Sequence, residues 1–240
     1  MYLETINSPA DVKKLGTEEL TALAAEMREA LIVRASRHMG HVGPDLGFIE
    51  ATVALHAVFD SPEDKIIYDI SHQTYPHKML TGRREAYTDP AHYDDVSAYS
   101  NPKESPHDFF ELGHTSVSID LALGMAKARN LLGGTEKVIA VIGDGSLSGG
   151  EALEGLNTAG EFEGQFLILI NDNQMSIAEN HGGLYASLKA LRESNGTSEN
   201  NLFRAMGLDY RYEAAGNDIG ALIRVLNEVK DADHPLVLHI

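Results

Sequence analysis

The stretch VIAVIGDGSLSGGEALEGLNTAGEFEGQFLILINDNQMSI, residues 138–177, decides the fold of this chain of 240 residues. Two short apolar runs flank a segment with helical character, and the runs end on the triplets GDG and NDN. Short continuous apolar runs are typical of parallel strands that are buried on both faces. The stretch therefore predicts a βαβ unit in which Asp144 and Asn173 lie at the ends of two neighbouring strands.

The same alternation of strand and helix continues on both sides of this unit. Helices are predicted at 17–36, 48–59, 113–132 and 218–230. Further strands are predicted at 64–70, at the start of YRYEAAG (210–216) and at 236–240. We expect Leu121, Met125 and Ala128 to share the buried side of the helix at 113–132. Residues 81–112 have weak periodicity and are predicted as loop or short helix. Strands that alternate with helices in this way predict an α/β fold, an open, mostly parallel sheet flanked by helices.

Composition limits the classes of protein that the chain can belong to. No composition shift or linker divides the sequence, so we predict a single domain over residues 1–240. Its 36 acidic residues outnumber 19 basic ones, and this net charge of −17 argues against nucleic acid or an anionic membrane as partner. There is no cysteine, apolar runs such as FLILI are too short to span a bilayer, and the first residues lack a secretory core. We expect a cytoplasmic protein.

The residues that follow the two strands predict a ligand site. In open α/β sheets, ligands bind outside the carboxyl ends of the strands. Asp144 and Asn173 would supply oxygen ligands there, which suit Mg²⁺. Gly143 and Gly145 would allow the backbone to approach a phosphate group. A metal ion that bridges the negative charges would let an acidic protein hold a diphosphate.

Two other interpretations of the GDG triplet remain open. Asp-Gly is a common turn, so the triplet alone is weak support for a site. A dinucleotide-binding turn requires G-x-G-x-x-G, but here Gly143 and Gly145 are followed by Ser148 at the third position. The NDNQM segment also offers amides where such a fold places a single acid for the ribose.

Taken together, these motifs resemble a known enzyme family. GDG and NDN at this spacing resemble the signature of thiamine diphosphate enzymes, and the surrounding sequence is similar to 1-deoxy-D-xylulose-5-phosphate synthases of the transketolase superfamily. Three further stretches agree with this family, GHVGPDLGFIEATVALH, YDISHQTYPHKMLTGRRE and FFELGHTSVSIDLALGMAKAR. The resemblance covers nearly the whole chain and implies the thiamine diphosphate-binding fold.

The resemblance also implies roles for particular residues, with thiamine diphosphate and Mg²⁺ as cofactors. Asp144, the side chain of Asn173 and the carbonyl of Met175 would bind Mg²⁺, and Asn173 would also be a cofactor-binding residue. Gly145 and Ser146 would contact the diphosphate, while His72, Gly113, His114 and Thr115 would face the cofactor. His41 would line the substrate side, and His41 and His72 would be catalytic, as donors to the substrate or as proton shuttles.

Not every histidine is expected to belong to the site. Most histidines in proteins are surface or hydrogen-bonded structural residues, and we assign that role to His56, His92, His107, His181, His234 and His239. The Gly or Ser neighbours of His41, His72 and His114 favour a site role for these three. His77 is open between the two interpretations.

The resemblance implies a transferase that moves a ketol or acetyl unit between sugar phosphates or from pyruvate. In the family, a further domain binds the pyrimidine ring of the cofactor. We therefore expect a C-terminal subunit or domain as partner, no activity without it, and a homodimer or heterotetramer. The segment after Leu184 is shorter than in the synthases and favours a transketolase-type reaction. The alternative is a non-catalytic scaffold or regulatory module that keeps the cofactor-binding fold.

Overall fold

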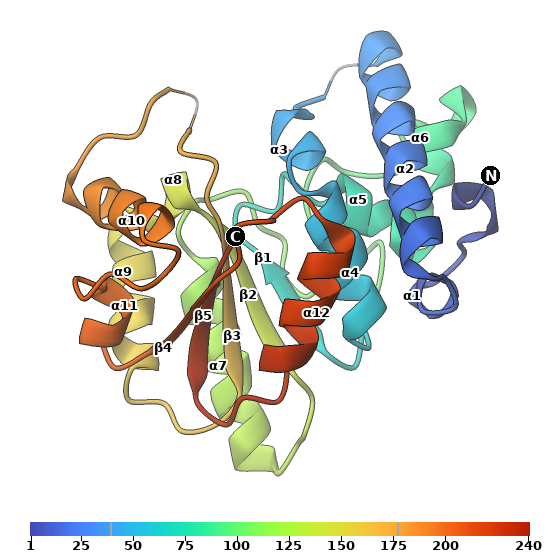
Figure 1. The fold of residues 1–240 in the computed structure, drawn as a ribbon. Helices are drawn as coiled ribbons and strands as arrows, with labels where there is room; N and C mark the ends of the chain where they lie inside the picture. The colour runs from blue at the N-terminus through green and yellow to red at the C-terminus, as the bar shows by residue number, and fades with distance from the viewer. Residues whose placement is uncertain (39, 177) are drawn as a thin grey trace. The chain divides into compact units, whose positions relative to one another are not determined.

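The computed structural model describes residues 1–38, 40–176 and 178–240, and Figure 1 shows its elements along the chain. The chain forms two compact units. The first contains Met1–Glu63, Ser71–Gly113 and Gly216–Asn227, and the second contains Asp64–Ile70, His114–Ala215 and Glu228–Ile240. The chain thus passes between the units several times. The single domain expected from the sequence stays a prediction.

A parallel sheet forms the centre of the second unit. Its strands are β1 (Lys65–Tyr68), β2 (Val138–Gly143), β3 (Phe166–Asn171), β4 (Asp209–Tyr212) and β5 (Pro235–His239). They lie in the order β1-β2-β3-β5-β4, and every neighbouring pair is parallel. The predicted parallel α/β fold is confirmed. Side chains 139–142 of β2 and 167–170 of β3 are at most 1% exposed, because neighbouring structure covers both faces of these strands.

The register of the two central strands positions the predicted site. β2 and β3 are hydrogen-bonded neighbours, and Gly143 at the end of β2 pairs with Asn171 at the end of β3. Asp144 and Asp172, the next residues in each segment, therefore leave the sheet at the same edge. This adjacency confirms the βαβ unit predicted from the sequence.

The helices of the second unit are α7 (Ser118–Leu132), α8 (Asp144–Leu147), α9 (Gly150–Ala159), α10 (Gly183–Glu193) and α11 (Leu202–Ala205). Helix α7 packs against β1, β2 and α9. The buried side predicted for this helix is wrong, because Leu121 and Met125 are only half-buried and Ala128 is exposed. The buried residues are instead Ile119, Ala122, Leu123 and Ala126. The small alanines of this face let the helix lie close to its neighbours.

The first unit is helical. Its elements are η1 (Leu3–Thr5), α1 (Pro9–Val12), α2 (Thr17–Arg37), α3 (Gly43–Leu46), α4 (Ile49–Val58), α5 (Tyr75–Lys78), η2 (Met79–Arg83), α6 (Glu85–Thr88), η3 (Pro90–His92) and most of α12 (Ile219–Val229). The helices predicted at 17–36, 48–59 and 218–230 are confirmed, as are the short helices within 81–112. Leu23, Met27 and Leu31 of α2 join the core of this unit.

Helix α2 is capped by residues at its own start. Gly16 is the N-cap residue, and its backbone N–H donates to Glu19 Oε2 at 2.8 Å. The acidic residue in the first turn therefore satisfies a free backbone donor of the helix start. Among the helices that the structure describes, none combines the length and apolar character needed to cross a bilayer.

Candidate functional site

Two aspartates meet at the carboxyl edge of the sheet in the second unit. Asp144 is 2% exposed, and the side chain of Asp172 is fully buried. Burial, together with the neighbouring Asp172 carboxylate, raises the pKa of Asp144 to about 7. Burial acts in the same direction on Asp172, but a hydrogen bond from His239 and the charge of Arg192 hold the pKa of Asp172 below its usual range. Carboxylates this close repel one another, so the arrangement favours a shared proton or a bound cation.

Asp172 is held by residues of two other elements, and one of these residues is supported by a third. His239 at the end of β5 donates from Nε2 to Asp172 Oδ2 at 3.0 Å, and the Arg192 guanidinium of α10 binds the same oxygen. The Tyr210 hydroxyl of β4 lies 2.7 Å from His239 Nδ1. Because the carboxylate only accepts, His239 carries its proton on Nε2 and accepts from Tyr210. This network fixes the loop that follows β3, the loop that contains Asn173.

The amide group that reaches Asp144 is that of Asn180. Its Nδ2 donates to Asp144 Oδ2 at 2.7 Å, and its Oδ1 accepts from Ser176 Oγ at 2.6 Å. The Asn173 side chain instead accepts from the backbone N–H of Met175 at 2.9 Å within the loop. Asn180 was not singled out from the sequence. Its only signal was a position in the same loop as NDN.

Gly145 and Ser146 lie where the loop after β3 approaches the GDG turn. A β-carbon on Gly145 would lie 2.2 Å from Ser176 Oγ, so a larger residue here would force the Ser176 side chain to move. The Ser146 carbonyl accepts from Ser116 Oγ at 2.7 Å. The helix expected directly after GDG is interrupted, because α8 has four residues and α9 begins only at Gly150.

The turn around His114 is fixed by a buried carboxylate. Asp69 follows β1, is 1% exposed, and accepts from the backbone N–H groups of Ser116 and Ser118 at 2.9 Å each. His114 and Thr115 are exposed, and His114 Nδ1 donates to the Thr115 carbonyl at 2.8 Å. The Nε2 atom of His114 is then an acceptor that a ligand can use. Asp69 was not singled out from the sequence, although it lies near the end of a predicted strand.

The first unit brings the two predicted catalytic histidines together. The rings of His41 and His72 stack with centroids 5.5 Å apart at an angle of 26°. His41 is exposed and His72 half-buried. His77 lies elsewhere in this unit, is 1% exposed, and donates from Nε2 to Asp108 Oδ1 at 3.1 Å. That buried pairing is typical of a structural histidine.

The predicted site residues thus form two groups, one in each unit. The first unit holds His41, His72 and Gly113; the second holds His114, Thr115, Asp144, Gly145, Ser146, Asn173 and Met175.

The donor atoms of the second unit fit a hard divalent cation. In the part of the chain that the structure describes, no group of three or more His, Cys, Asp or Glu side chains is arranged to hold a metal ion. Mg²⁺ does not need such a group, because it takes one or two carboxylates, carbonyl oxygens and water. Asp144 and the amides of the loop after β3 supply donors of this kind.

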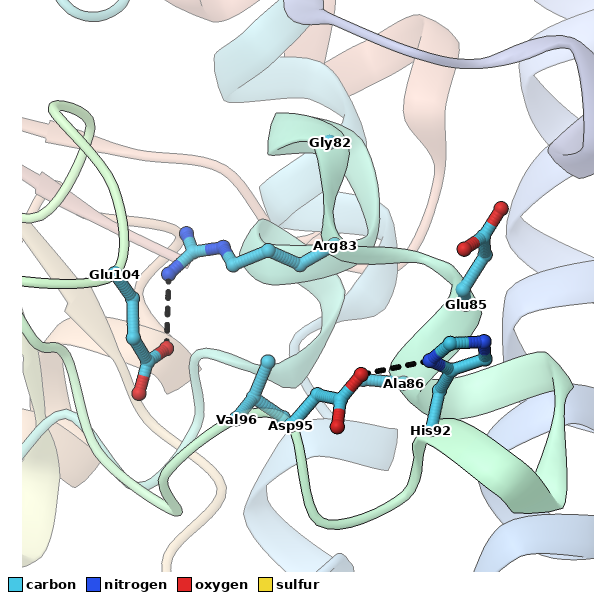
Figure 2. A pocket seen from close by; sticks show the side chains of 8 residues that line it. All are labelled: Gly82, Arg83, Glu85, Ala86, His92, Asp95, Val96 and Glu104. Carbon is cyan, nitrogen blue, oxygen red and sulfur yellow. Dashed lines mark hydrogen bonds and ion pairs between the residues drawn. The ribbon is translucent and has the colours of Figure 1, made fainter.

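A separate pocket lies within the first unit. Its volume is about 230 Å³, and its lining includes Arg83, Glu85, His92, Asp95 and Glu104. Figure 2 shows that two pairs span it, Arg83 with Glu104 at 3.3 Å and His92 with Asp95 at 2.7 Å. Four of the charged side chains of the pocket thus already form pairs, while Figure 2 draws no such bond to Glu85. None of the predicted site residues lines it.

Comparison with known proteins assigns the chain to a family. A family model described as 1-deoxy-D-xylulose-5-phosphate synthase matches residues 3–201. The chain belongs to the 1-deoxy-D-xylulose-5-phosphate synthase family. The resemblance of GDG, NDN and the three further stretches is thereby confirmed.

Curated members of this synthase family match the chain over almost all of its length. A 1-deoxy-D-xylulose-5-phosphate synthase of Geobacter sulfurreducens is 40% identical over 274 residues, which cover 99% of this chain and 44% of the relative. The synthase of Porphyromonas gingivalis is 42% identical over 275 residues and covers 99% of this chain and 43% of the relative. The chain spans less than half the length of these relatives.

Solved structures of transketolases share the fold of the synthase-family chain. A transketolase mutant of Pichia stipitis superposes with a TM-score of 0.72 at 17% identity, covering 94% of this chain and 36% of that one. Transketolase from Leishmania mexicana gives a TM-score of 0.70 at 17% identity with the same coverage. At this identity the likeness shows the fold alone.

Proposed function

We propose that the chain is the diphosphate-binding part of a thiamine diphosphate- and Mg²⁺-dependent transferase of the 1-deoxy-D-xylulose-5-phosphate synthase and transketolase type. Membership of the synthase family supports the reaction class. The observation that carries the proposal is the pair of contacting carboxyl groups, Asp144 and Asp172, at the ends of adjacent parallel strands. Because Arg192 already compensates the charge of Asp172, a divalent cation bound by Asp144 would keep one positive charge for a diphosphate.

In this proposal the second unit holds the metal and the diphosphate. Asp144, the Asn173 side chain and the Met175 carbonyl bind Mg²⁺, and Asn173 would turn away from the Met175 N–H that it now accepts from. Asp172 is not a metal ligand in this proposal. Its carboxylate binds His239 and Arg192 and thereby holds the loop that follows β3. Gly145, Ser146, His114 and Thr115, with Gly113, bind the cofactor.

The histidines of the first unit would serve the reacting end of the cofactor. When bound, thiamine diphosphate supplies the nucleophilic carbon that a ketol or acetyl transfer requires. His41 and His72 would donate to substrate oxygens or hold and move protons there. Their stacked rings support a joint role, since both would reach the same substrate.

The partner and the substrates follow from the family. Because the chain spans 44% of a synthase from Geobacter sulfurreducens, we propose that a C-terminal domain or subunit completes the enzyme and that it works as a homodimer or heterotetramer. The donor would be pyruvate or a sugar phosphate. The matched relatives carry additional residues, since the 274 aligned residues exceed the 240 of this chain. The transketolase-type donor stays a prediction. The cytoplasmic location also stays a prediction.

Calorimetric titration of thiamine diphosphate into the chain, with and without Mg²⁺, tests the proposal. We expect binding that requires Mg²⁺ and that weakens at least about 10-fold to 100-fold in Asp144→Asn, because a metal ligand is lost. Absence of binding, even with the C-terminal region supplied in trans, would favour the scaffold alternative.

Asp64→Asn is the matched control. Asp64 belongs to the same unit and accepts from the backbone N–H of Lys137 at 2.7 Å, but it precedes β1 and so lies at the amino edge of the sheet. Its replacement should leave the affinity for thiamine diphosphate unchanged. An equal loss in both variants would point to general destabilisation and contradict the assigned site.

A further inference from the structure

The stacked histidines of the first unit lie on two separate loops, so their ring geometry depends on how these loops are held relative to each other. His41 precedes α3, and His72 precedes α5. Their rings lie 5.5 Å apart, yet His41 is exposed and therefore not held by surrounding core. A pair of partly solvated side chains keeps a fixed geometry only when the backbone under each is fixed.

The backbone directly before His72 is held in an unusual conformation. Ser71 has a φ of 69°, which is uncommon for a residue with a side chain. Two hydrogen bonds hold it there, from Ser100 N to Ser71 Oγ at 2.9 Å and from Thr74 Oγ1 to the Ser71 carbonyl at 2.6 Å. The loop is thus tied down on the side that precedes His72 and within the turn that follows it.

Asp45 makes the connection between the two loops. It lies in α3, is 0% exposed, and its Oδ1 accepts from the backbone N–H of Tyr75, the first residue of α5, at 2.9 Å. The first N–H groups of a helix have no partner inside the helix, so this carboxyl caps α5 from another segment. Helix α3 is in turn bonded to the residue that follows His41, because Leu46 N donates to the Val42 carbonyl at 3.0 Å.

Helix α3 has its own support on α2. The Arg28 guanidinium donates to the Leu46 carbonyl at 2.6 Å and pairs with Glu50. Further along α2, buried Arg34 donates to the Ala86 and Tyr93 carbonyls and lies 5.3 Å from the Tyr75 ring centroid. Asp45 therefore joins two braced elements rather than two free loops.

The environment of Asp45 indicates which replacement keeps its function. Burial raises the pKa of Asp45 well above its usual range, and the charge of Arg34 opposes this only in part. The second oxygen, Oδ2, is buried and makes no hydrogen bond to the residues that the structure describes. An amide has the shape of the carboxyl group and keeps an acceptor oxygen for Tyr75, so Asn is the conservative variant.

We propose that Asp45 is a positioning residue that locks the start of α5 to α3 and thereby fixes the stacked His41–His72 pair. The catalytic role of the His41–His72 pair rests on the proposed function. The geometry of the pair is independent of that function. The test is therefore made without cofactor.

Nuclear magnetic resonance of the 240-residue chain with labelled histidines tests this role. In the parent chain, we expect a cross-peak between ring protons of His41 and His72 and slow hydrogen exchange at Tyr75 N–H. Asp45→Ala should lose the cross-peak and exchange the Tyr75 amide at least about tenfold faster, because a buried acceptor is lost. Asp45→Asn should restore both signals.

Glu26→Ala is the matched control, since Glu26 also accepts from backbone N–H groups, those of Tyr2 and Leu3, in the same unit. It should leave the histidine cross-peak in place. A cross-peak retained in Asp45→Ala, or lost equally in Asp45→Asn, would overturn the proposal.

If Asp45→Ala does not fold, warming the parent chain supplies the test. Loss of Tyr75 protection and loss of the ring cross-peak should then occur together, and a cross-peak that outlasts the protection would overturn the proposal. Absence of cofactor binding would leave this result intact and would count against the proposed function alone.

Discussion

At the scale of single residues, Gly149 is where the GDG segment and the His114 turn come closest. A β-carbon at Gly149 would lie 1.9 Å from Ser116 Oγ, and Ser116 is itself held at a φ of 75°. Gly149→Ala should therefore lower the free energy of unfolding by about 1–3 kcal/mol, as overpacking does. Urea denaturation followed by circular dichroism measures this change.

The neighbouring glycine is a close control for that substitution. A β-carbon at Gly150 would meet no atom within 4 Å, so Gly150→Ala should leave stability unchanged or raise it by up to about 1 kcal/mol. Equal effects at the two positions would contradict the close contact with Ser116.

The residue scale also marks the limit of what the sequence predicts. Asp144 was found because acidic residues at the end of an apolar run carry a recognisable pattern. Asn180 and Asp69 were not found, since a hydrogen bond from Asn180 to Asp144 depends on how the loop after β3 folds back. No periodicity in the sequence encodes that path.

At the scale of elements, the Asp172–His239 bond joins the ends of β3 and β5. His239→Ala should destabilise the chain by about 3–5 kcal/mol, because it removes a partner of a buried carboxylate and leaves the Tyr210 hydroxyl without its acceptor. Denaturant unfolding measures the change. His234→Ala removes only a solvent-exposed bond to the Gly207 carbonyl and should cost less than about 1 kcal/mol. Equal losses in the two variants would contradict the role of the Asp172–His239 bond.

The segment around His107 and Asp108 in the first unit predicts sensitivity to acid. Burial and the positive charge of Arg83 lower the pKa of His107 to about 4, and burial also lowers the pKa values of His56 and His77. The unfolded chain, with histidine pKa values of about 6.5, thus binds more protons below that pH. These groups therefore reduce the free energy of unfolding as pH falls from about 6.5 towards 4.

Unfolding free energies of His107→Gln and the parent chain at pH 7 and pH 5 test this effect. The raised pKa of Asp144 acts in the opposite direction, so the difference between variant and parent at each pH is the informative quantity. The variant should lose less stability than the parent on acidification. A parallel loss in both would contradict the assignment to His107.

Elements whose apolar residues allow one interpretation were predictable from the sequence. The buried side of a helix with apolar residues on several sides was not. The apolar runs of β2 and β3 have a single interpretation as buried strands. Helix α7 has apolar residues on several sides, and even the exposed side carries Leu131 and Leu132 at 87% and 86% exposure. Which side is buried depends on the sheet and α9 together, and this tertiary choice is absent from the local sequence.

At the scale of the whole molecule, the chain has the fold of the synthase family and less than half the length of its curated relatives. The sequence predicted the parallel sheet because strand and helix alternate clearly. It did not predict two compact units, since no linker or composition shift separates them and the chain crosses between them repeatedly. Activity is accordingly proposed for an assembly with a C-terminal partner.

The most direct test of the central claim is to place Mn²⁺ with thiamine diphosphate on the chain and record amide resonances. Mn²⁺ replaces Mg²⁺ at oxygen sites and broadens signals of nearby nuclei. We predict that the amides of Asp144, Gly145 and Asn173 are broadened, while Lys65 and Lys137 at the opposite edge of the sheet stay sharp. Broadening centred elsewhere, or none at saturating cofactor, would contradict a metal–diphosphate site at the carboxyl ends of β2 and β3.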